Sequence, residues 1–323
     1  MAISIAFVAL IIELIAGYPQ WLVNRIGHPV IWMGGLIDHF DRKFNRPDQP
    51  SAGTRKAGMV CLLVLVIIAL IIALAVVWLA GLTGFETILV ALAAAPLIAQ
   101  RSLSSHVGAV ANAISQDGLD AGRAAVGRIV GRDTAELDES GISRAAIESL
   151  AENFSDGIVA PVFWLAVAGL PGIVVYKTIN TADSMIGHKS DKHVDFGRAT
   201  ARIDDLVNLP ASRLTALLVV AIAFFMPGAS GRNAWGAVWR DARLHRSPNA
   251  GWPEAAFAGA LGLELAGPRR YGDEVVDDAV MGKGGRPVAT AADIRRALSL
   301  YWAADVLMIC LFGAAASLIV FHG

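Results

Sequence analysis

One uninterrupted apolar run constrains this chain more than any other feature of its sequence. Residues 57–80 include no charged side chain. A helix that crosses the hydrocarbon of a bilayer needs roughly 17–25 mostly apolar residues. In that medium a helix is favoured because it satisfies its backbone hydrogen bonds within itself. The run therefore predicts a transmembrane helix, and with it an integral membrane protein.

Other segments have a similar length and composition, at residues 3–23, 85–98 with flanks, 158–176, 209–226 and 301–321. The whole chain of 323 residues is 55% hydrophobic and only 17% charged, whereas a soluble domain carries about 25% charged residues. We predict an all-α, polytopic membrane helix bundle of about 4–6 membrane segments, some re-entrant, together with interfacial helices. We expect one integral membrane domain over residues 1–323.

The net charge and the cysteine content argue against a nucleic-acid-binding protein and against a disulfide- or cysteine–metal-stabilised protein. The formal net charge is −1, so the chain lacks a basic field for nucleic acid and we expect no nucleic-acid partner. Cys61 and Cys310 lie within apolar runs, where free cysteines usually pack as small hydrophobic side chains. We therefore expect neither a disulfide framework nor a cysteine metal site.

The placement of the polar loops is ambiguous. Residues 24–56 are rich in arginine and lysine, which predicts a cytoplasmic loop. If residues 158–176 and 209–226 both simply crossed the membrane, the polar segment 177–208 would face the opposite side. Pro161, Pro171 and nearby glycines interrupt the first of these segments, as in broken helices that line a cavity. We favour re-entrant segments that keep the polar loops on one side.

The first acidic cluster comprises Glu148, Glu152 and Asp156. Their spacing of i, i+4 and i+8 would place three carboxylates along one stripe of a continuing helix. A solvated helix face is the plain alternative. The stripe runs into an apolar segment, however, and carboxylates at a membrane boundary are costly to keep without a function. A divalent cation would relieve their mutual repulsion.

The second cluster follows in residues 176–193. Asn180, Asp183 and Ser184 supply the hard oxygen ligands that suit Mg²⁺. Gly187 permits a turn, after which His188 and Lys189 could donate to a phosphate, with Lys192 and His193 as further cationic donors. A polar interfacial loop with lysines that reach the membrane surface is an equal alternative.

The third cluster comprises Asp204, Asp205 and Asn208. Asp204 and Asn208 would share a helix face, a geometry suited to holding Mg²⁺ and phosphate. Pro210 is expected to end or kink that helix, and Arg202 and Arg213 flank the cluster as phosphate donors. Any single acidic pair could be a structural cap, but three clusters beside membrane segments favour a chemical site.

Five motifs resemble the CobD/CbiB family, the adenosylcobinamide-phosphate synthases of cobalamin biosynthesis. They are IVGRDTAELD (129–138), SRAAIESLAENFSDGIVAP (143–161), YKTINTADSMIGHK (176–189), FGRATARIDDLVNLP (196–210) and GWPEAAFAGALGLELAGP (251–268). The resemblance covers essentially the whole chain.

The resemblance implies a multi-pass enzyme of the bacterial inner (cell) membrane. Such an enzyme joins a carboxylate of adenosylcobyric acid to the amine of (R)-1-aminopropan-2-ol O-phosphate and yields adenosylcobinamide phosphate. Amide formation from a free carboxylate is uphill in water, so we expect ATP and Mg²⁺, with the corrinoid as substrate and not cofactor. The chain lacks a Gly-rich Walker loop, so a nucleotide would need another cradle. As partners we expect these substrates, the lipid bilayer, and either further copies of the chain or late cobamide-pathway enzymes.

We assign roles to the polar residues as a hypothesis. The catalytic candidates are Glu148, Glu152, Asp183 and Lys189. The substrate- or phosphate-binding candidates are Asn153, Asn180, Ser184, His188, Arg202 and Arg213. The metal candidates are Asp156, Asp183, Asp204 and Asp205.

Two other functions remain as alternatives. A membrane prenyltransferase also uses a helical aspartate-rich site for Mg²⁺-diphosphate, but with two motifs on facing helices, where this chain has three clusters. A scaffold of a membrane biosynthetic complex would bind without turnover. A transporter should have paired broken helices in two halves, and the sequence has no such internal symmetry.

Overall fold

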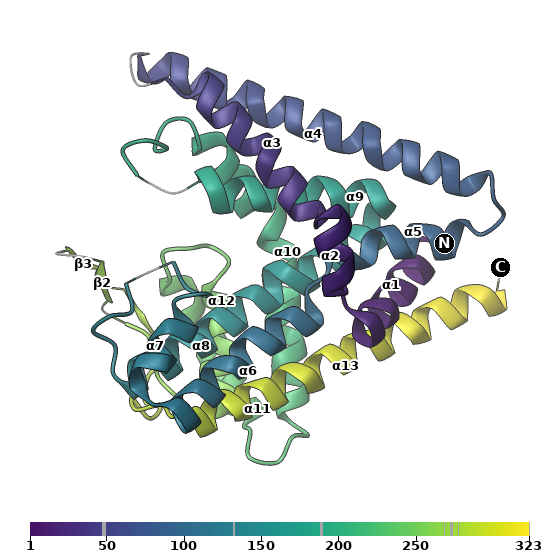
Figure 1. Cartoon of the computed structure of the whole chain (residues 1–323). Coiled ribbons are helices and arrows are strands. Elements are labelled where there is room, and N and C mark those ends of the chain that lie inside the picture. The colour runs from purple at the N-terminus through teal and green to yellow at the C-terminus, as the bar shows by residue number, and fades with distance from the viewer. Residues whose placement is uncertain are drawn as a thin grey trace. The chain divides into compact units, whose positions relative to one another are not determined.

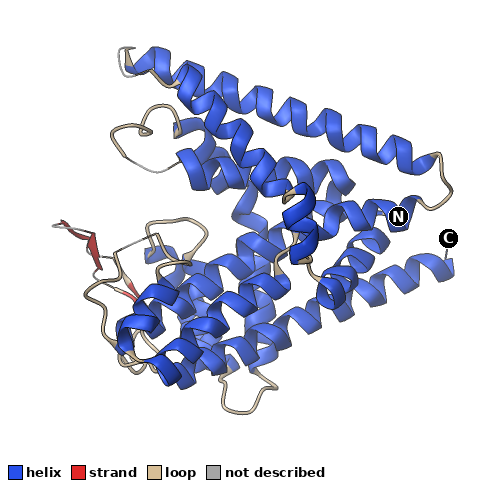
Figure 2. Ribbon diagram, viewed as in Figure 1, coloured by secondary structure: helices blue, strands red, loops and turns tan. Residues whose placement is uncertain are grey.

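The structure is a computed structural model that describes residues 1–46, 50–131, 133–187, 190–267, 269–271, 274–276 and 278–322. Helices make up most of it, and strands are confined to short pairs (Figure 2). The helices in the first half are α1 (Ala2–Ala16), α2 (Gln20–Ile26), α3 (Pro29–Phe44), α4 (Ser51–Gly81), α5 (Glu86–Ala94), η1 (Ala95–Leu97), α6 (Gln100–Asp117), α7 (Leu119–Val126) and α8 (Glu139–Phe154).

The second half begins with a π-helical turn. Its elements are η2 (Ser155–Val159), α9 (Ala160–Ile186), α10 (Arg198–Ala223), α11 (Gly231–Asp241), η3 (Ala242–Leu244), α12 (Gly251–Leu261) and α13 (Ala291–His322). Two antiparallel strand pairs precede α13: β1 (Leu265–Ala266) with β4 (Val280–Met281), and β2 (Arg269–Tyr271) with β3 (Glu274–Val276).

Contacts divide the chain into two compact units. Unit 1 comprises Met1–Ala99, Ala160–Asn208 and Phe312–Gly323, and unit 2 comprises Gln100–Val159 and Leu209–Leu311. Each is described by itself below. The expectation of one domain over residues 1–323 stays a prediction.

The polytopic membrane architecture is confirmed. Among the described residues, five helices are long and apolar enough to cross a membrane, or up to six if one bent pair counts as a span. On α4 the exposed stripe Leu63, Ile67, Ile71, Leu74 and Trp78 is apolar throughout. Hydrocarbon is the solvent that suits such a face.

The expected first span at residues 3–23 is wrong as a single helix. Helix α1 ends at Ala16, and the chain bends by 105° before residues Gln20–Phe44. Gly17 adopts φ 57°, a left-handed conformation that ends the helix. Pro19 then precedes α2 and lacks a backbone N–H to continue the ladder. Glu13, near the end of α1, is buried within unit 1.

In unit 1, α9 packs against α1, α3, α4 and α5 (Figure 1). A core of Ile37, Cys61, Leu65, Ile179 and Phe196 joins α3, α4, α9 and the segment before α10. Helix α4 and α5 form the expected hairpin across a short turn. Both cysteines are free, as predicted.

The predicted interruption between residues 158 and 176 is confirmed. Ala168 and Gly169 leave helical geometry within α9, and Gly169 has φ 65°. The segment after this break, which carries the second polar cluster, therefore takes its own direction. Pro210, in contrast, does not end its helix, because α10 continues to Ala223. Whether any segment is re-entrant stays a prediction.

In unit 2, α6 packs against α7 and α8, and α11 packs against α12 (Figure 1). The α11–α12 contact requires Gly259, since a Cβ there would lie 2.5 Å from the Asn233 carbonyl oxygen. Helix α12 is almost wholly buried, as its small side chains allow. Asp138 caps α8 by accepting from the Gly141 N–H at 2.7 Å, as expected for this acidic turn.

Candidate functional site

A polar cluster of unit 1 lies between α9 and α10. Tyr176, Asn180 and Asp183 follow one another at helical spacing on the second half of α9, while Asp204 and Asn208 stand one turn apart on α10. Asn208 Nδ2 donates to Asp204 Oδ2 at 2.9 Å, and Tyr176 Oη donates to Asn208 Oδ1 at 2.8 Å. Asn180 Nδ2 lies 3.4 Å from Asp204 Oδ1. The predicted pairing of Asp204 with Asn208 on one face is confirmed.

The carboxylate of Asp204 is held almost entirely inside the protein. Its exposed fraction is 8%, and that of Asn208 is 1%. A buried carboxylate is costly unless it is hydrogen-bonded, and here each oxygen accepts from a neutral amide. Asp183 and Asp205 lie close enough to repel it. The cluster therefore concentrates negative charge around oxygen ligands, an arrangement that a divalent cation would stabilise.

These oxygen ligands suit Mg²⁺ only if water and substrate phosphates complete its coordination. Among the described residues, no group of three His, Cys, Asp or Glu side chains could hold a metal ion. Mg²⁺ commonly keeps several waters and uses one or two carboxylates together with substrate phosphates. Asp183 and Asp204 could supply those carboxylates, and Asn180 an amide oxygen.

Asp183 folds back over the turn that follows α9. Its backbone oxygen accepts from the Gly187 N–H at 2.8 Å. A Cβ at Gly187 would lie only 1.8 Å from Asp183 Oδ1. The glycine is therefore needed where the carboxylate lies, and not only for the flexibility of the turn. His188 and Lys189 lie outside the described residues.

We expect Gly187→Ala to reduce product formation at least tenfold. The added methyl group must displace the Asp183 carboxylate, and moving a catalytic group by about 1 Å greatly lowers the rate. Initial rates of product formation would test this. Asp191→Ala is a suitable control, since Asp191 is an exposed residue of the same loop. Equal rates for Gly187→Ala and the unmodified chain would contradict the importance of this contact.

The other unit 1 candidates lie around this cluster or farther along the two helices. Ser184 is exposed and its hydroxyl donates to the Asn180 carbonyl oxygen at 2.9 Å. Arg202 is exposed on α10, and Asp205 is half-buried. Lys177, which the assigned roles omit, lies 3.4 Å from Asn180 Oδ1 through its Nζ.

Lys192 and His193 contact a carboxylate of α3. Lys192 Nζ donates to Asp41 Oδ2 at 2.5 Å, and His193 Nε2 lies 3.3 Å from the same oxygen. Asn45 also donates to Asp41 Oδ1 at 2.8 Å. These contacts tie the loop after α9 to α3, and the role of Lys192 and His193 as further phosphate donors stays a prediction. The spacing of Asp41 and Asn45 on one helix face was the signal available in the sequence.

A second ion pair fixes the same loop to α4. Arg55 Nε donates to Asp195 Oδ1 at 2.7 Å. The Ser51 hydroxyl and the Arg55 guanidinium hold the pKa of Asp195 below its usual value. The ion pairs with Asp41 and Arg55 attach the segment between α9 and α10 to α3 and α4. The polar cluster therefore lies beside a segment that is held at both of these helices.

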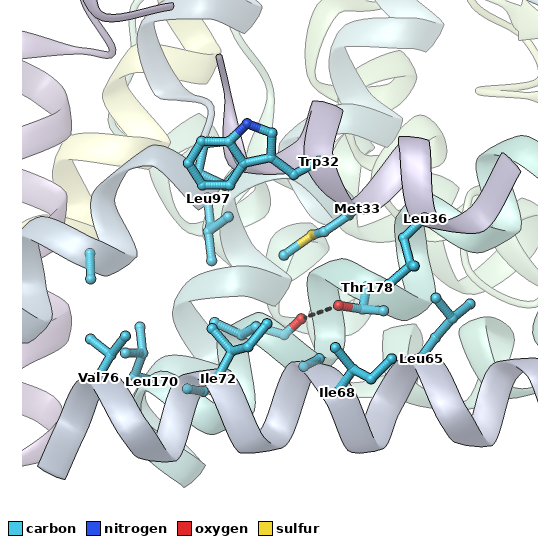
Figure 3. Close-up of a pocket in the computed structure, with 15 residues that line it drawn as sticks. Trp32, Met33, Leu36, Leu65, Ile68, Ile72, Val76, Leu97, Leu170 and Thr178 are labelled. Carbon is cyan, nitrogen blue, oxygen red and sulfur yellow. Dashed lines mark hydrogen bonds between the residues drawn. The ribbon is translucent and has the colours of Figure 1, made fainter. Parts of the chain in front are cut away.

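An apolar pocket of about 340 Å³ lies among α3, α4 and α9, also in unit 1 (Figure 3). Trp32, Met33, Ile72 and Leu170 point into it. Thr178 also lines the pocket, and its hydroxyl donates to the Val174 carbonyl oxygen at 2.8 Å. The volume is at the lower end for small-molecule sites, so the pocket could receive an apolar group of a ligand or lipid.

The acidic stripe of α8 does not continue as predicted. Glu148 and Glu152 belong to α8, but the π-helical turn η2 begins at Ser155 and contains Asp156. A π-helical turn pairs residues five apart and changes the angular spacing of side chains. Glu148 is buried, whereas Glu152 and Asn153 are exposed. The three carboxylates therefore do not follow one α-helical stripe.

Glu148 holds a strained loop in unit 2. Its Oε1 accepts from the Ala266 N–H at 2.7 Å, and Arg144 donates to the Ala266 carbonyl oxygen. Ala266 has φ 54°, which is unfavourable for a residue with a Cβ. Glu148 and Arg144 thus stabilise a left-handed residue from both sides. The catalytic assignment of Glu148 stays a prediction.

We expect Glu148→Ala to lower the free energy of unfolding by about 1–3 kcal/mol, because the buried Ala266 N–H loses its acceptor. Glu148→Gln keeps a side-chain oxygen and should unfold close to the unmodified chain. Thermal unfolding in detergent would measure both variants. Equal destabilisation by the two variants would contradict the anchoring role, and the rate of Glu148→Gln separately tests whether the charge serves catalysis.

Arg213 is held within unit 2 by several contacts. Its Nη1 donates to the Leu209 carbonyl oxygen at 3.1 Å and to Asn249 Oδ1 at 3.0 Å. The guanidinium also lies 4.5 Å from the centre of the Trp252 ring, within reach of a cation–π interaction. These contacts position the segment before α12, and the predicted phosphate-binding role stays a prediction.

The predicted site residues thus fall into the two units. Unit 1 contains Asn180, Asp183, Ser184, Arg202, Asp204 and Asp205. Unit 2 contains Glu148, Glu152, Asn153, Asp156 and Arg213. Two residues were missed by the prediction from sequence, Asp41 and Tyr176. The hydrogen bond from the Tyr176 hydroxyl to Asn208 joins two helices, so no local spacing reveals it. That both sets form one site stays a prediction.

Comparison with known proteins gives a consistent result. The family model described as CobD/Cbib protein matches residues 6–301. The cobalamin biosynthesis protein CobD of Rhizobium meliloti (strain 1021) is 49% identical over 314 residues, 97% of this chain and 96% of that protein. That of Brucella suis biovar 1 (strain 1330) is 49% identical over 321 residues, 98% of this chain and 97% of that protein.

A third relative extends the similarity to another genus. The cobalamin biosynthesis protein CobD of Rhodobacter capsulatus is 47% identical over 313 residues, 96% of each chain. No solved structure matches the chain.

Proposed function

The chain belongs to the CobD/CbiB protein family, and from this premise we propose that it is an adenosylcobinamide-phosphate synthase of cobalamin biosynthesis. In this proposal the enzyme lies in the bacterial inner membrane. It joins a carboxylate of adenosylcobyric acid to the amine of (R)-1-aminopropan-2-ol O-phosphate through an amide bond. The named relatives support the pathway, and the membrane helices agree with the location.

The proposed reaction needs an activated carboxylate. ATP with Mg²⁺ would supply this activation through transfer of the γ-phosphate to the corrinoid carboxylate, which gives an acyl phosphate and ADP. The aminoalcohol nitrogen then attacks the acyl carbon, inorganic phosphate leaves, and the nitrogen loses a proton. The chain must bind phosphate groups near acidic ligands and exclude water from the acyl phosphate.

The observation that best supports this proposal is the buried Asp204 carboxylate beside Asp183. Two asparagine amides hold Asp204 in place, and the Tyr176 hydroxyl in turn positions Asn208. Such a prearranged carboxylate would hold Mg²⁺ and so stabilise charge that develops in phosphoryl transfer. His188, Lys189 and Arg202 are the proposed phosphate donors.

Product analysis tests the proposal directly. The purified chain in detergent would receive adenosylcobyric acid, aminopropanol phosphate and Mg²⁺, with and without ATP, and mass spectrometry would detect the amide. We expect ATP-dependent formation of adenosylcobinamide phosphate. Binding of both substrates without turnover under every condition would instead favour a scaffold, and transfer from an added prenyl diphosphate would favour a prenyltransferase.

A further inference from the structure

A second pocket lies wholly within unit 2 and shares no residue with the predicted site. It has a volume of about 390 Å³. Its walls are α11, the C-terminal end of α12 and the glycine-rich turn Gly282–Arg286, which has the sequence GKGGR. Neither the family resemblance nor the acidic clusters assign a function to this turn.

The pocket is strongly cationic. Arg232, Arg240, Lys283 and Arg286 line it, and none of its described lining residues is acidic. Arg240 pairs with Asp241 through two contacts of 2.7 Å. Arg286 pairs with Asp293 at 2.7 and 2.8 Å. These two cations are therefore compensated by carboxylates outside the lining.

Arg232 and Lys283 differ from the other two cations. Both are exposed, and neither has a carboxylate partner among the described residues. They come from separate elements, the first turn of α11 and the glycine-rich turn, and they line the same pocket. Within the part of the chain that the structure describes, these are two positive charges at one concave site without a paired carboxylate, an electrostatic match for a dianion.

The backbone of the glycine-rich turn is fixed. Asp241 Oδ2 accepts from the Gly282 N–H at 2.8 Å and from the Lys283 N–H at 3.2 Å. Glu264 Oε1 accepts from the Gly284 N–H at 2.9 Å. The positions from which Lys283 and Arg286 extend are thus already set, which reduces the entropy lost when a ligand binds.

The glycines of the pocket serve two different purposes. A Cβ at Gly285 would lie 2.6 Å from the Leu263 carbonyl carbon, and one at Gly282 would lie 2.3 Å from the Leu263 oxygen, so both allow close packing. A Cβ at Gly236, Gly262 or Gly284 would meet no atom within 4 Å. These three glycines therefore border open space in the lining of the pocket.

We propose that this unit 2 pocket binds a phosphate group, with Arg232 and Lys283 as its principal cationic donors. A phosphate monoester carries about −1.5 to −2 charges at neutral pH, which two cations neutralise. Arginine can bind two phosphate oxygens at once, and lysine acts as a point charge. An arginine that binds two oxygens and a lysine that contacts a third would together suit one terminal phosphate.

The phosphate could belong to a soluble compound or to an anionic lipid headgroup. The exposed Trp235 and Trp239 of α11 bear on the second source, since tryptophan is enriched where a protein meets the membrane surface. Both sources present the same chemical group to the pocket, so the experiment needs one arm for each.

In the first arm the full-length protein in an uncharged detergent is titrated with inorganic phosphate, and calorimetry measures the dissociation constant. In the second arm the protein is placed in nanodiscs of phosphatidylcholine with or without phosphatidic acid, and native mass spectrometry measures retained anionic lipid. We expect saturable binding in at least one arm. The combined change Arg232→Gln and Lys283→Gln should weaken that binding at least tenfold.

Two controls separate loss of the site from loss of the fold. Arg243→Gln removes a neighbouring exposed cation that does not line the pocket, and should change binding by no more than about twofold. Gly236→Ala should fold and bind, since its Cβ meets no atom and alanine favours a helix. Gly236→Glu places a carboxylate in the pocket and should abolish binding while the thermal midpoint stays that of Gly236→Ala.

The outcomes are distinct. Phosphate binding that Gly236→Glu abolishes supports a site for a soluble phosphate compound, and lost retention of phosphatidic acid supports a lipid headgroup site. Absence of binding in both arms overturns the proposal. Binding that survives the double change, or that Arg243→Gln weakens equally, also overturns it. The proposal does not depend on the amide-forming activity.

Discussion

Asp204→Asn should reduce the proposed formation of adenosylcobinamide phosphate by about 100-fold or more, the usual scale for loss of one preorganised electrostatic group. The change keeps the size of the side chain but removes its negative charge. Asp204 is buried and both of its oxygens accept from amides. Without this charge, the proposed Mg²⁺ site would keep Asp183 but lose the buried carboxylate beside it, and the repulsion between the two carboxylates would disappear.

Stability should respond to this change much less than activity. The introduced amide cannot accept from both Asn180 and Asn208 in the present arrangement, so one hydrogen bond is lost. That loss costs about 1 kcal/mol, and relief of repulsion between carboxylates offsets part of it. Initial rates at several Mg²⁺ concentrations and a thermal unfolding curve would measure the two effects.

Tyr176→Phe provides a graded comparison for Asp204→Asn. It removes only the hydroxyl that donates to Asn208, so we expect a smaller loss of rate, about tenfold, with an increased requirement for Mg²⁺. Asp191→Asn changes an exposed carboxylate of the loop between α9 and α10 and should leave the rate unchanged. Full activity of Asp204→Asn would remove this residue from the site.

Much of the membrane architecture was predictable because hydrocarbon accepts only long apolar helices or closed barrels. The run at residues 57–80 accordingly lies within α4. The predicted span at residues 3–23 failed for a local reason. The mean hydropathy of this segment does not register the break at Gly17, Tyr18 and Pro19. One glycine in a left-handed conformation and one proline are enough to end a helix there.

The site was predictable to the extent that it depends on helical spacing. Asp204 and Asn208 share a face because they are four residues apart. The contact of Asn208 with Tyr176 depends on how α9 packs against α10, and that information is not in either local pattern. The apparent stripe from Glu148 to Asp156 failed because a π-helical turn changes the spacing after Phe154.

Proximity in sequence was also a poor guide to which acids share a compact unit. Glu148 on α8 and Asp183 on α9 lie on consecutive long helices, yet they belong to different compact units. The cationic pocket of unit 2 was overlooked for the converse reason. Arg232 and Lys283 are far apart in sequence, and only the fold brings both to one pocket.

The position of the loop between α9 and α10 depends on Gly58 of α4. The substitution Gly58→Ala should demonstrate this. A Cβ at Gly58 would lie 1.9 Å from the Phe196 carbonyl oxygen, so the backbone of that loop has to move. Phe196 is fully buried in the unit 1 core beside Cys61 and Ile179. We expect a loss of about 1–3 kcal/mol in the free energy of unfolding, the usual cost of overpacking.

Gly35→Ala is the matched control, because a Cβ at Gly35 in α3 would meet no atom within 4 Å. This substitution should leave stability unchanged or raise it by about 0.5–1 kcal/mol. The displaced loop should also weaken the attachments of Lys192 to Asp41 and of Asp195 to Arg55. The rate should therefore fall in Gly58→Ala even at a temperature where the protein remains folded. If thermal unfolding and rate were the same in both alanine variants, the close approach of α4 to this loop would have no influence on the site.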